Sequence, residues 1–164
     1  LIGWSHNINS TFFQVGTMAS AGIKNMAETG NTSPLSEEID SRISNGEGYF
    51  NILGSGLGSG TGEISVDIVV NESNPAVSLS TMVAPSPDWY VAVINVNLLE
   101  NGSFVNEKVI DAHVYDAGTD DGETYTSPNM PTNPQSPITL FVDSPMGNGT
   151  ELNAVIATVK FKKK

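Results

Sequence analysis

The sequence predicts a mostly β protein, an antiparallel β-sandwich with one or two short helices near the N-terminus. Charged residues make up only 15% of the 164 residues, and the 16 glycines and 9 prolines are typical of strands joined by turns. Apolar and polar residues alternate in several segments after residue 63, as they do in strands with one buried face. The length is that of one domain, so residues 1–164 are expected to form a single domain.

The first third of the chain carries signals for one strand and two short helices. The run Phe12–Val15 is expected to be the first strand. The run Met18–Glu28 is expected to be a helix, because several of its apolar residues fall on one helical face. Ser36 is expected to cap a second helix, with Glu37 and Glu38 in its first turn. The residues on the apolar face of the first helix are Ala19, Ile23, Met26 and Ala27.

The remainder of the chain is expected to consist of strands separated by turns. Residues 54–62 (GSGLGSGTG) are expected to be a flexible turn, because they lack both the glycine spacing of dinucleotide-binding loops and the lysine of phosphate-binding loops. The run Trp89–Leu98 is apolar on both faces at first and then alternates, which predicts a central strand. Further strands are expected at Ile64–Val70, Val77–Thr81, Val109–Tyr115, Ile138–Val142 and Leu152–Phe161.

The charge and cysteine content exclude several classes of partner and site. The formal net charge is −11, so nucleic acid and anionic lipid surfaces, which require basic patches, are not expected partners. No stretch approaches the roughly 20 apolar residues of a membrane span, so direct membrane insertion is not expected. The absence of cysteine excludes a disulfide scaffold, a zinc–thiolate site and a cysteine nucleophile. The C-terminal lysines, expected to end a solvated strand, are Lys160, Lys162, Lys163 and Lys164.

The sequence contains no pattern that indicates catalysis. His113 lies inside a predicted strand and is interpreted as an ordinary sheet residue, and His6 lies near one end of the chain. The nucleophile motif G-x-S-x-G is absent. A glycosidase needs two carboxylates in one cleft, and no such pair stands out among the acidic residues. The chain is therefore not expected to be an enzyme.

Three aspartates form the candidate site. Asp88 lies in the run 84–89 (APSPDW), and Asp116 and Asp120 lie in the run 115–122 (YDAGTDDG). Both runs are expected to be loops at strand ends, where the carboxylates face one another and repel unless a cation lies between them. Calcium takes roughly 6 to 8 oxygen ligands. Asp111 and Asp121 are expected to surround the site and add negative potential.

Alternative roles for these aspartates differ in how well they fit the spacing. An EF-hand is excluded, because the twelfth position counted from Asp116 is Ser127 and not glutamate. Zinc is disfavoured because the chain has no cysteine and no clustered histidine, and magnesium tends to keep its waters. Aspartates in turns also bond their own backbone. On spacing alone, that purely structural interpretation stays open.

The two aspartate runs identify a family. Residues 82–89 (MVAPSPDW), 115–122 and 125–129 (YTSPN) resemble the spondin domain of the F-spondin and mindin proteins, and residues 19–28 and 38–39 are similar to its helical region. The resemblance extends from about His6 to Val142. It implies a β-sandwich related in shape to C2 domains, with one calcium ion (Ca²⁺) bound by loops at one end. The family's metal aspartates correspond to Asp88, Asp116 and Asp120. The resemblance further implies extracellular-matrix and cell-surface adhesion.

The sequence also departs from the animal members of that family. The cysteine pair that follows their Asp-Trp motif is absent from residues 97–104, and thrombospondin-type repeats are absent as well. From these differences we expect a stand-alone, disulfide-free microbial relative, and the integrin-ligand role of the animal proteins is not transferred to it.

The sequence therefore favours a secreted or cell-surface calcium-binding module for adhesion or recognition, with an extracellular protein or a glycan as its partner. Two alternatives stay open. One is a purely structural module of a surface layer or matrix, in which the metal only fastens loops together. The other is a hydrolase that acts on a polysaccharide.

Overall fold

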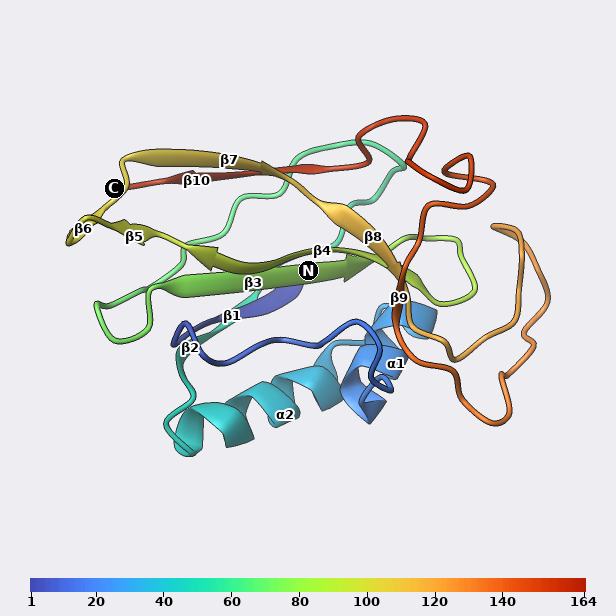
Figure 1. Ribbon diagram of the computed structural model, residues 1–164, viewed down its shortest axis with the longest axis horizontal. Coiled ribbons are helices and arrows are strands. Elements are labelled where there is room, and N and C mark those ends of the chain that lie inside the picture. Colours follow the sequence, from blue (N-terminus) through green and yellow to red (C-terminus); the bar gives the residue numbers. More distant parts are fainter.

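The computed structural model describes residues 1–164 as three layers (Figure 1). A six-stranded antiparallel sheet lies in the middle, two helices cover one face, and a two-stranded ribbon with extended segments covers the other. The prediction of a mostly β, antiparallel fold with helices near the N-terminus is confirmed. The elements in chain order are β1 (Ile2–His6), α1 (Ala21–Thr29), α2 (Ser33–Ser44), β2 (Gly48–Leu53), β3 (Ala76–Met82), β4 (Trp89–Asn97), β5 (Leu99–Glu100), β6 (Ser103–Phe104), β7 (Glu107–Asp111), β8 (His113–Asp116), β9 (Thr139–Leu140) and β10 (Thr158–Lys162).

The six-stranded sheet has the strand order β2-β1-β3-β4-β8-β9. β4 lies between β3 and β8, so the prediction that the apolar run beginning at Trp89 forms a central strand is confirmed. In the antiparallel register of β4 and β8, Trp89 is opposite Asp116 and Tyr90 is opposite Tyr115. Because alternate residues point to opposite faces, Trp89 enters the core on the ribbon side and Tyr90 enters the core on the helix side.

Both expected helices form, and the second begins earlier than predicted. The Oγ of Ser20 caps α1 by accepting a hydrogen bond from the Ile23 N–H at 3.1 Å. Glu38, from α2, accepts a hydrogen bond from the Gly22 N–H at 2.7 Å and thereby ties the two helices together. α2 starts at Ser33 with Pro34 in its first turn, so Ser36 lies inside the helix and is not its cap.

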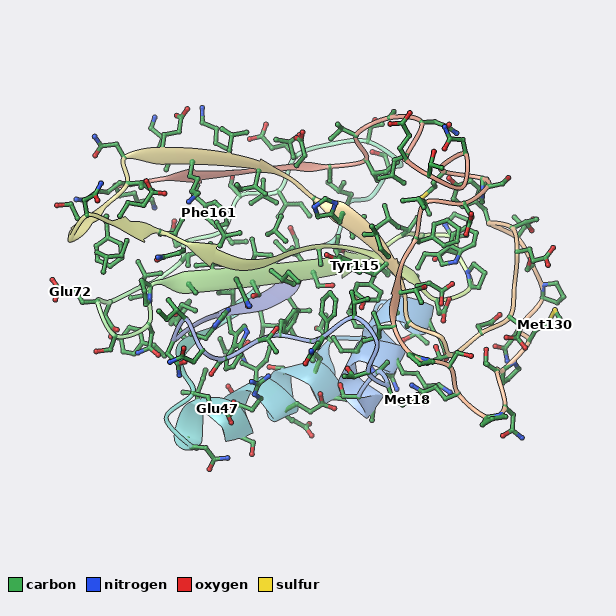
Figure 2. The ribbon with its side chains drawn as sticks, viewed as in Figure 1. Met18, Glu47, Glu72, Tyr115, Met130 and Phe161 are labelled. Atoms are coloured by element: carbon green, nitrogen blue, oxygen red, sulfur yellow. The ribbon has the colours of Figure 1, made fainter.

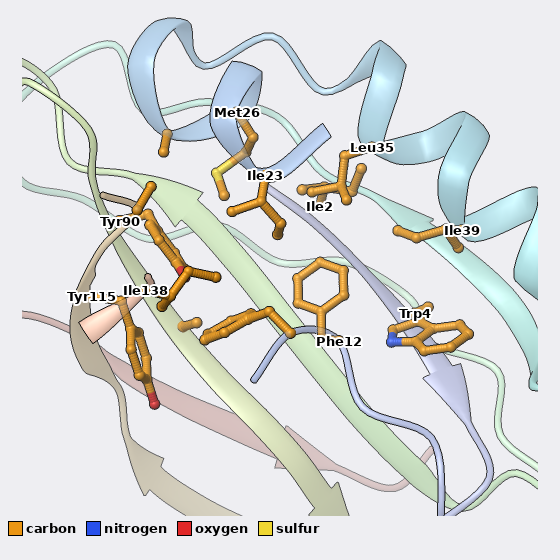
Figure 3. Close-up of a cluster of buried hydrophobic side chains, with 14 residues drawn as sticks. Ile2, Trp4, Phe12, Ile23, Met26, Leu35, Ile39, Tyr90, Tyr115 and Ile138 are labelled. Atoms are coloured by element: carbon orange, nitrogen blue, oxygen red, sulfur yellow. The ribbon is translucent and has the colours of Figure 1, made fainter. Parts of the chain in front are cut away.

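Two hydrophobic cores lie on opposite faces of the sheet. The first fills the space between the sheet and the helices, and Figure 3 shows Trp4, Phe12 and Ile23 within it. The expected strand at residues 12–15 is wrong: Phe12 and Phe13 lie in a loop and both side chains are buried, whereas a strand would direct one of them outward. The second core lies between the sheet and the ribbon, and Figure 2 shows Phe161 pointing from β10 toward it.

The ribbon layer is less regular than the alternating sequence predicts. Residues 64–70 were expected to be a strand, but no strand forms there, and the inward side chains pack against the second core without backbone pairing. The expected strands near residues 109–115, 138–142 and 152–161 are split or shortened. A second layer of the sandwich does form, but part of it is held by apolar packing and not by a ladder of backbone hydrogen bonds. No helix of the structure is long and apolar enough to cross a membrane.

Candidate metal centre

The site lies where β4 begins and β8 ends. Because Trp89 is opposite Asp116 in the register, Asp88 sits directly beside the end of β8. The indole Nε1 of Trp89 donates a hydrogen bond to Asp116 Oδ2 at 3.2 Å. The two sequence motifs are therefore brought together by strand pairing, at the end of the molecule opposite the C-terminus (Figure 1).

Asp88 is the most deeply buried of the three candidate ligands, with no exposed surface. Its Oδ2 accepts hydrogen bonds from the Thr119 N–H at 2.7 Å, the Asp120 N–H at 3.1 Å and the Thr119 hydroxyl at 3.2 Å. Its Oδ1 is buried and has no hydrogen-bond partner. A buried carboxylate oxygen without a donor is costly, because it has lost water without a replacement.

Asp116 and Asp120 organise the loop that follows β8. Asp116 Oδ1 accepts from the Gly118 N–H at 2.7 Å, and Asp120 Oδ1 accepts from the Gly122 N–H at 2.9 Å. Asp120 Oδ2 also accepts from the Met130 N–H at 3.1 Å. Both aspartates therefore bond backbone two residues ahead, as the structural interpretation of the motif predicts.

Gly118 is required by the path of this loop. Its φ of +70° lies in the left-handed region that favours glycine. A Cβ at this position would also collide with the carbonyl oxygen of Ser136. The close approach of these two backbone segments holds the loop against the chain that leads into β9.

Burial and like charge both act on the carboxylates. Burial raises the pKa of Asp88 to about 6, the Asp116 charge contributes to this rise, and the hydrogen bonds from Thr119 and Asp120 oppose it. Burial also raises the pKa of Asp116, against the hydrogen bonds from Gly118 and Trp89. The two neighbouring acids thus hold protons more tightly than isolated aspartates do, which is the condition that a bound cation would relieve.

A polar cleft of about 800 Å³ opens beside the aspartates. Asp116, Asp120 and Asp121 line it, and Asp121 Oδ1 accepts a hydrogen bond from the Thr132 hydroxyl at 2.7 Å. The cleft also contains Glu123, and Asp143, a residue that the sequence motifs did not indicate. The apolar residues of the lining are Trp89 and Phe141, and the remaining ones are Gly118, Gly122, Thr124, Thr132, Ser136, Ser144, Gly147, Asn148 and Gly149.

Asp111, expected near the site, is not among the residues that line the cleft. It ends β7 in the two-stranded ribbon, and its Oδ1 accepts a hydrogen bond from the Thr158 hydroxyl at 2.9 Å. Two residues not predicted as contacts instead donate to the aspartates: Thr119, which lies inside the run 115–122, and Met130, which lies outside both runs. Nothing in the local sequence of Met130 signals this contact, because it depends on how a loop ten residues downstream folds back.

The carboxylate oxygens of this site are of the type that binds a hard cation, but they are not arranged around one common point. No group of three or more acidic or histidine side chains in the structure is placed as a metal ligand set. Each ionised carboxylate offers about four lone pairs, so the single hydrogen bonds on Asp116 and Asp120 oxygens leave acceptor capacity. Oxygen donors with no cysteine nearby fit calcium. The three carboxylates would have to turn toward one another to share one ion.

The histidines lie outside this site. His6 is fully buried, and its Nε2 lies 2.8 Å from the Ser78 hydroxyl. This serine–histidine pair is closed to substrate, and the Ser78 Oγ also accepts a hydrogen bond from the Asn95 N–H. The pair therefore fixes the irregular part of β4, where Asn95 has a φ of +53°. His113 is exposed at the start of β8.

Comparison with known proteins yields one consistent group. The sequence matches the family model Spondin_N over residues 1–148. Spondin-2 of Rattus norvegicus is 31% identical over 140 residues, which cover 85% of this chain and 42% of that protein. Spondin-2 of Homo sapiens is 30% identical over 145 residues, covering 88% and 44%. Spondin-1 of Rattus norvegicus is 34% identical over 145 residues, covering 84% and 18%. The chain spans less than half the length of these relatives.

Proposed function

The chain belongs to the Spondin_N family, and from this membership we propose that it is a secreted or cell-surface module for adhesion or recognition, with one calcium ion bound at Asp88, Asp116 and Asp120. The role is non-enzymatic: the domain presents a surface to an extracellular protein or glycan. The observation that carries the calcium assignment is the buried Oδ1 of Asp88, which has no donor within the chain.

The energetics of the three carboxylates support a cation. Asp88, which is buried, and Asp116, which is half-buried, lie beside each other at the β4–β8 end and both have raised pKa values, and a third acid lies on the adjoining loop. A divalent ion would supply the missing partner of Asp88 and remove the repulsion between Asp88 and Asp116. Calcium suits a flexible loop site because it accepts variable geometry and mixes carboxylate, carbonyl and water ligands.

Calcium at this position would connect parts of the chain that are far apart in the sequence. Asp88 already receives hydrogen bonds from Thr119 and Asp120, and Asp120 receives one from Met130. An ion shared by the aspartates would stiffen these loops around the cleft. A coordination position open to the cleft would accept a carboxylate or a hydroxyl group of the partner, which is the chemistry of an acidic protein or a glycan.

Thermal unfolding with and without calcium tests the assignment. For a dissociation constant in the extracellular range of roughly 10⁻⁴–10⁻³ M, calcium at about 100 times that constant adds about 2.7 kcal/mol. For a chain of this length the melting temperature should rise by roughly 5–10 °C. The double variant Asp116→Asn/Asp120→Asn should lose this rise. Asp111→Asn, which makes the same chemical change outside the cleft, should keep it, and an equal rise in the double variant would remove these residues from the site.

A purely structural role for the ion is the second candidate, and the burial of Asp88 favours it. Because this carboxylate has no exposed surface, a partner cannot reach it directly. A binding screen against glycans and matrix proteins, with calcium or with chelator, separates the two roles. Calcium-dependent capture favours recognition through the cleft. Calcium-dependent stability without any calcium-dependent capture favours the structural role.

A further inference from the structure

The turn between β5 and β6 carries an Asn-Gly pair that the proposed function does not use. Asn101 and Gly102 form a two-residue loop, because Glu100 is opposite Ser103 in the register. Their φ angles are +51° and +75°, as a type I′ turn requires. Both residues are exposed, and the hairpin is a separate two-stranded sheet with only two residue pairs. A hairpin this short opens readily, because little packing and few backbone bonds oppose its opening.

An Asn-Gly pair reacts with itself, and the glycine backbone nitrogen is the nucleophile. After losing its proton to hydroxide, the nitrogen of Gly102 attacks the side-chain carbonyl carbon (Cγ) of Asn101. A C–N bond forms, the Cγ–Nδ2 bond breaks, and the departing nitrogen takes a proton from water and leaves as ammonia. Water then opens the five-membered succinimide at either carbonyl, which leaves an aspartyl or an isoaspartyl residue at position 101. Glycine favours this ring closure, because it has no Cβ to hinder the attack.

The fold engages the nucleophile in two of the three Asn-Gly pairs of the chain. The three pairs are residues 45–46, 101–102 and 148–149. The Gly46 N–H donates to the Ile43 carbonyl at 2.9 Å, and the Gly149 N–H donates to the Val142 carbonyl at 2.9 Å. Each of these nitrogens must leave its hydrogen bond before it attacks, which slows the reaction. The Gly102 N–H has no backbone partner.

The asparagine side chains differ in the same way. The Oδ1 of Asn148 accepts hydrogen bonds from the N–H groups of Thr150 and Glu151, both at 3.0 Å. Turning this amide toward the Gly149 nitrogen requires both bonds to break. The amide of Asn101 is exposed, and no hydrogen bond fixes it. Both reacting groups of the β5–β6 turn are therefore free.

We propose that Asn101 is a site of spontaneous deamidation in the folded chain, and that it reacts faster than Asn45 and Asn148. The isoaspartyl product lengthens the main chain of a two-residue loop, so it disrupts the pairing of β5 with β6. It also adds a negative charge beside Glu100, whose carboxylate pairs with Lys108 at 2.7 Å. The reaction needs only water and time, so the modified hairpin records the age of folded copies. It is independent of calcium, since the hairpin lies at the end of the molecule opposite the aspartate cleft (Figure 1).

Mass spectrometry of the ageing chain tests the assignment. The purified wild type is incubated in mildly alkaline buffer with chelator and digested, and the mass change from amide to acid is measured at each Asn-Gly pair. Conversion at Asn101 should be roughly tenfold faster than at Asn45 or Asn148, because those two sites must first break a hydrogen bond. Asn101→Gln should remove the fast conversion, because its longer side chain closes a larger ring more slowly. Asn45→Gln, the same change in a protected pair, should leave the fast conversion unchanged.

The same measurement in concentrated urea separates the effect of the fold from that of the local sequence. In the unfolded chain the three pairs should convert at similar rates, because their hydrogen bonds are gone. Two results would overturn the proposal. One is a folded wild-type chain in which Asn101 converts no faster than Asn45 or Asn148. The other is a preference for Asn101 that is unchanged in urea, since the neighbouring residues in the sequence would then be its cause.

Discussion

Trp89 and Asp116 lie opposite each other across the β4–β8 pair, and the Trp89 indole donates to the Asp116 carboxylate at 3.2 Å. The same indole stacks on Phe141 with 4.4 Å between the ring centroids. One side chain thus belongs to the second hydrophobic core and also orients a candidate metal ligand. Packing of the core and geometry of the site are consequently coupled at this residue.

Trp89→Phe should weaken both stability and calcium binding. The change removes the donor to Asp116 and leaves space where a buried ring was, so unfolding in urea should show a loss of about 1–3 kcal/mol. Calorimetric titration should show weaker calcium binding, because Asp116 loses the hydrogen bond that orients it. Phe141→Leu disturbs the same aromatic stack but keeps the donor to Asp116, so it should lower calcium affinity less than Trp89→Phe does. If Trp89→Phe bound calcium as tightly as the wild type does, the indole would have no role in calcium binding.

Without calcium, the Asp88 carboxylate should make the protein less stable as the pH rises from about 4 to about 6. Its ordinary pKa is 3.8, and burial raises this to about 6 in the folded chain. Between these values the folded state holds a proton that the unfolded state releases, so the free energy of unfolding falls as the pH rises. The full shift corresponds to about 3 kcal/mol. Asp116, whose pKa is also raised, acts in the same direction.

Asp88→Asn isolates this effect from other titrating groups. Burial lowers the pKa of His6, and the nearby Arg42 lowers it further, so His6 reduces stability as the pH falls below about 6.5, the opposite trend. The wild type and Asp88→Asn both contain His6. The contribution of His6 therefore cancels in the difference between their free energies of unfolding in urea. Asp88→Asn should match the wild type near pH 4, exceed it near pH 7, and show no calcium response. A difference that does not change with pH would contradict the raised pKa.

Gly118→Ala should be much more damaging than the same change at another glycine with positive φ. At Gly118 the left-handed backbone costs about 1–2 kcal/mol for alanine, and the collision with the Ser136 carbonyl adds to this. Gly16 has a φ of +88° but no atom near its Cβ position, so Gly16→Ala should cost only the backbone part, about 1–2 kcal/mol. Thermal unfolding measures both. Calcium affinity should fall in Gly118→Ala alone, and similar losses in both variants would indicate that backbone strain alone matters.

The sequence predicted the central strand, the first helix and the chain segments that meet at the cleft. These predictions succeed where a local pattern determines structure, as in the apolar face of α1. Other elements depend on tertiary context. All five residues of β1, including His6, are buried, so this strand has no alternation to detect. Residues 64–70 alternate as a strand should, yet find no backbone partner.

The placement of Asp111 shows why the neighbourhood of a site is harder to predict than its motif. Ala112 separates β7 from β8, and its N–H donates to the Ala157 carbonyl at 2.9 Å. Asp111 therefore belongs to the ribbon, while Asp116 belongs to the six-stranded sheet. Asp111 and Asp116 thus lie in different layers, although only Ala112 separates the two strands that carry them. Asp143 is brought to the cleft by a distant loop, which no spacing within the motifs could indicate.

A crystal structure of the chain in saturating calcium tests the central claim most directly. The account predicts one ion within roughly 2.3–2.6 Å of carboxylate oxygens of Asp88, Asp116 and Asp120, with Asp88 Oδ1 among them. The Asp88→Asn protein under the same conditions should contain no ion at this position. A wild-type structure in which calcium is absent, or bound only by the other cleft acids Asp121, Glu123 and Asp143, would contradict the assignment.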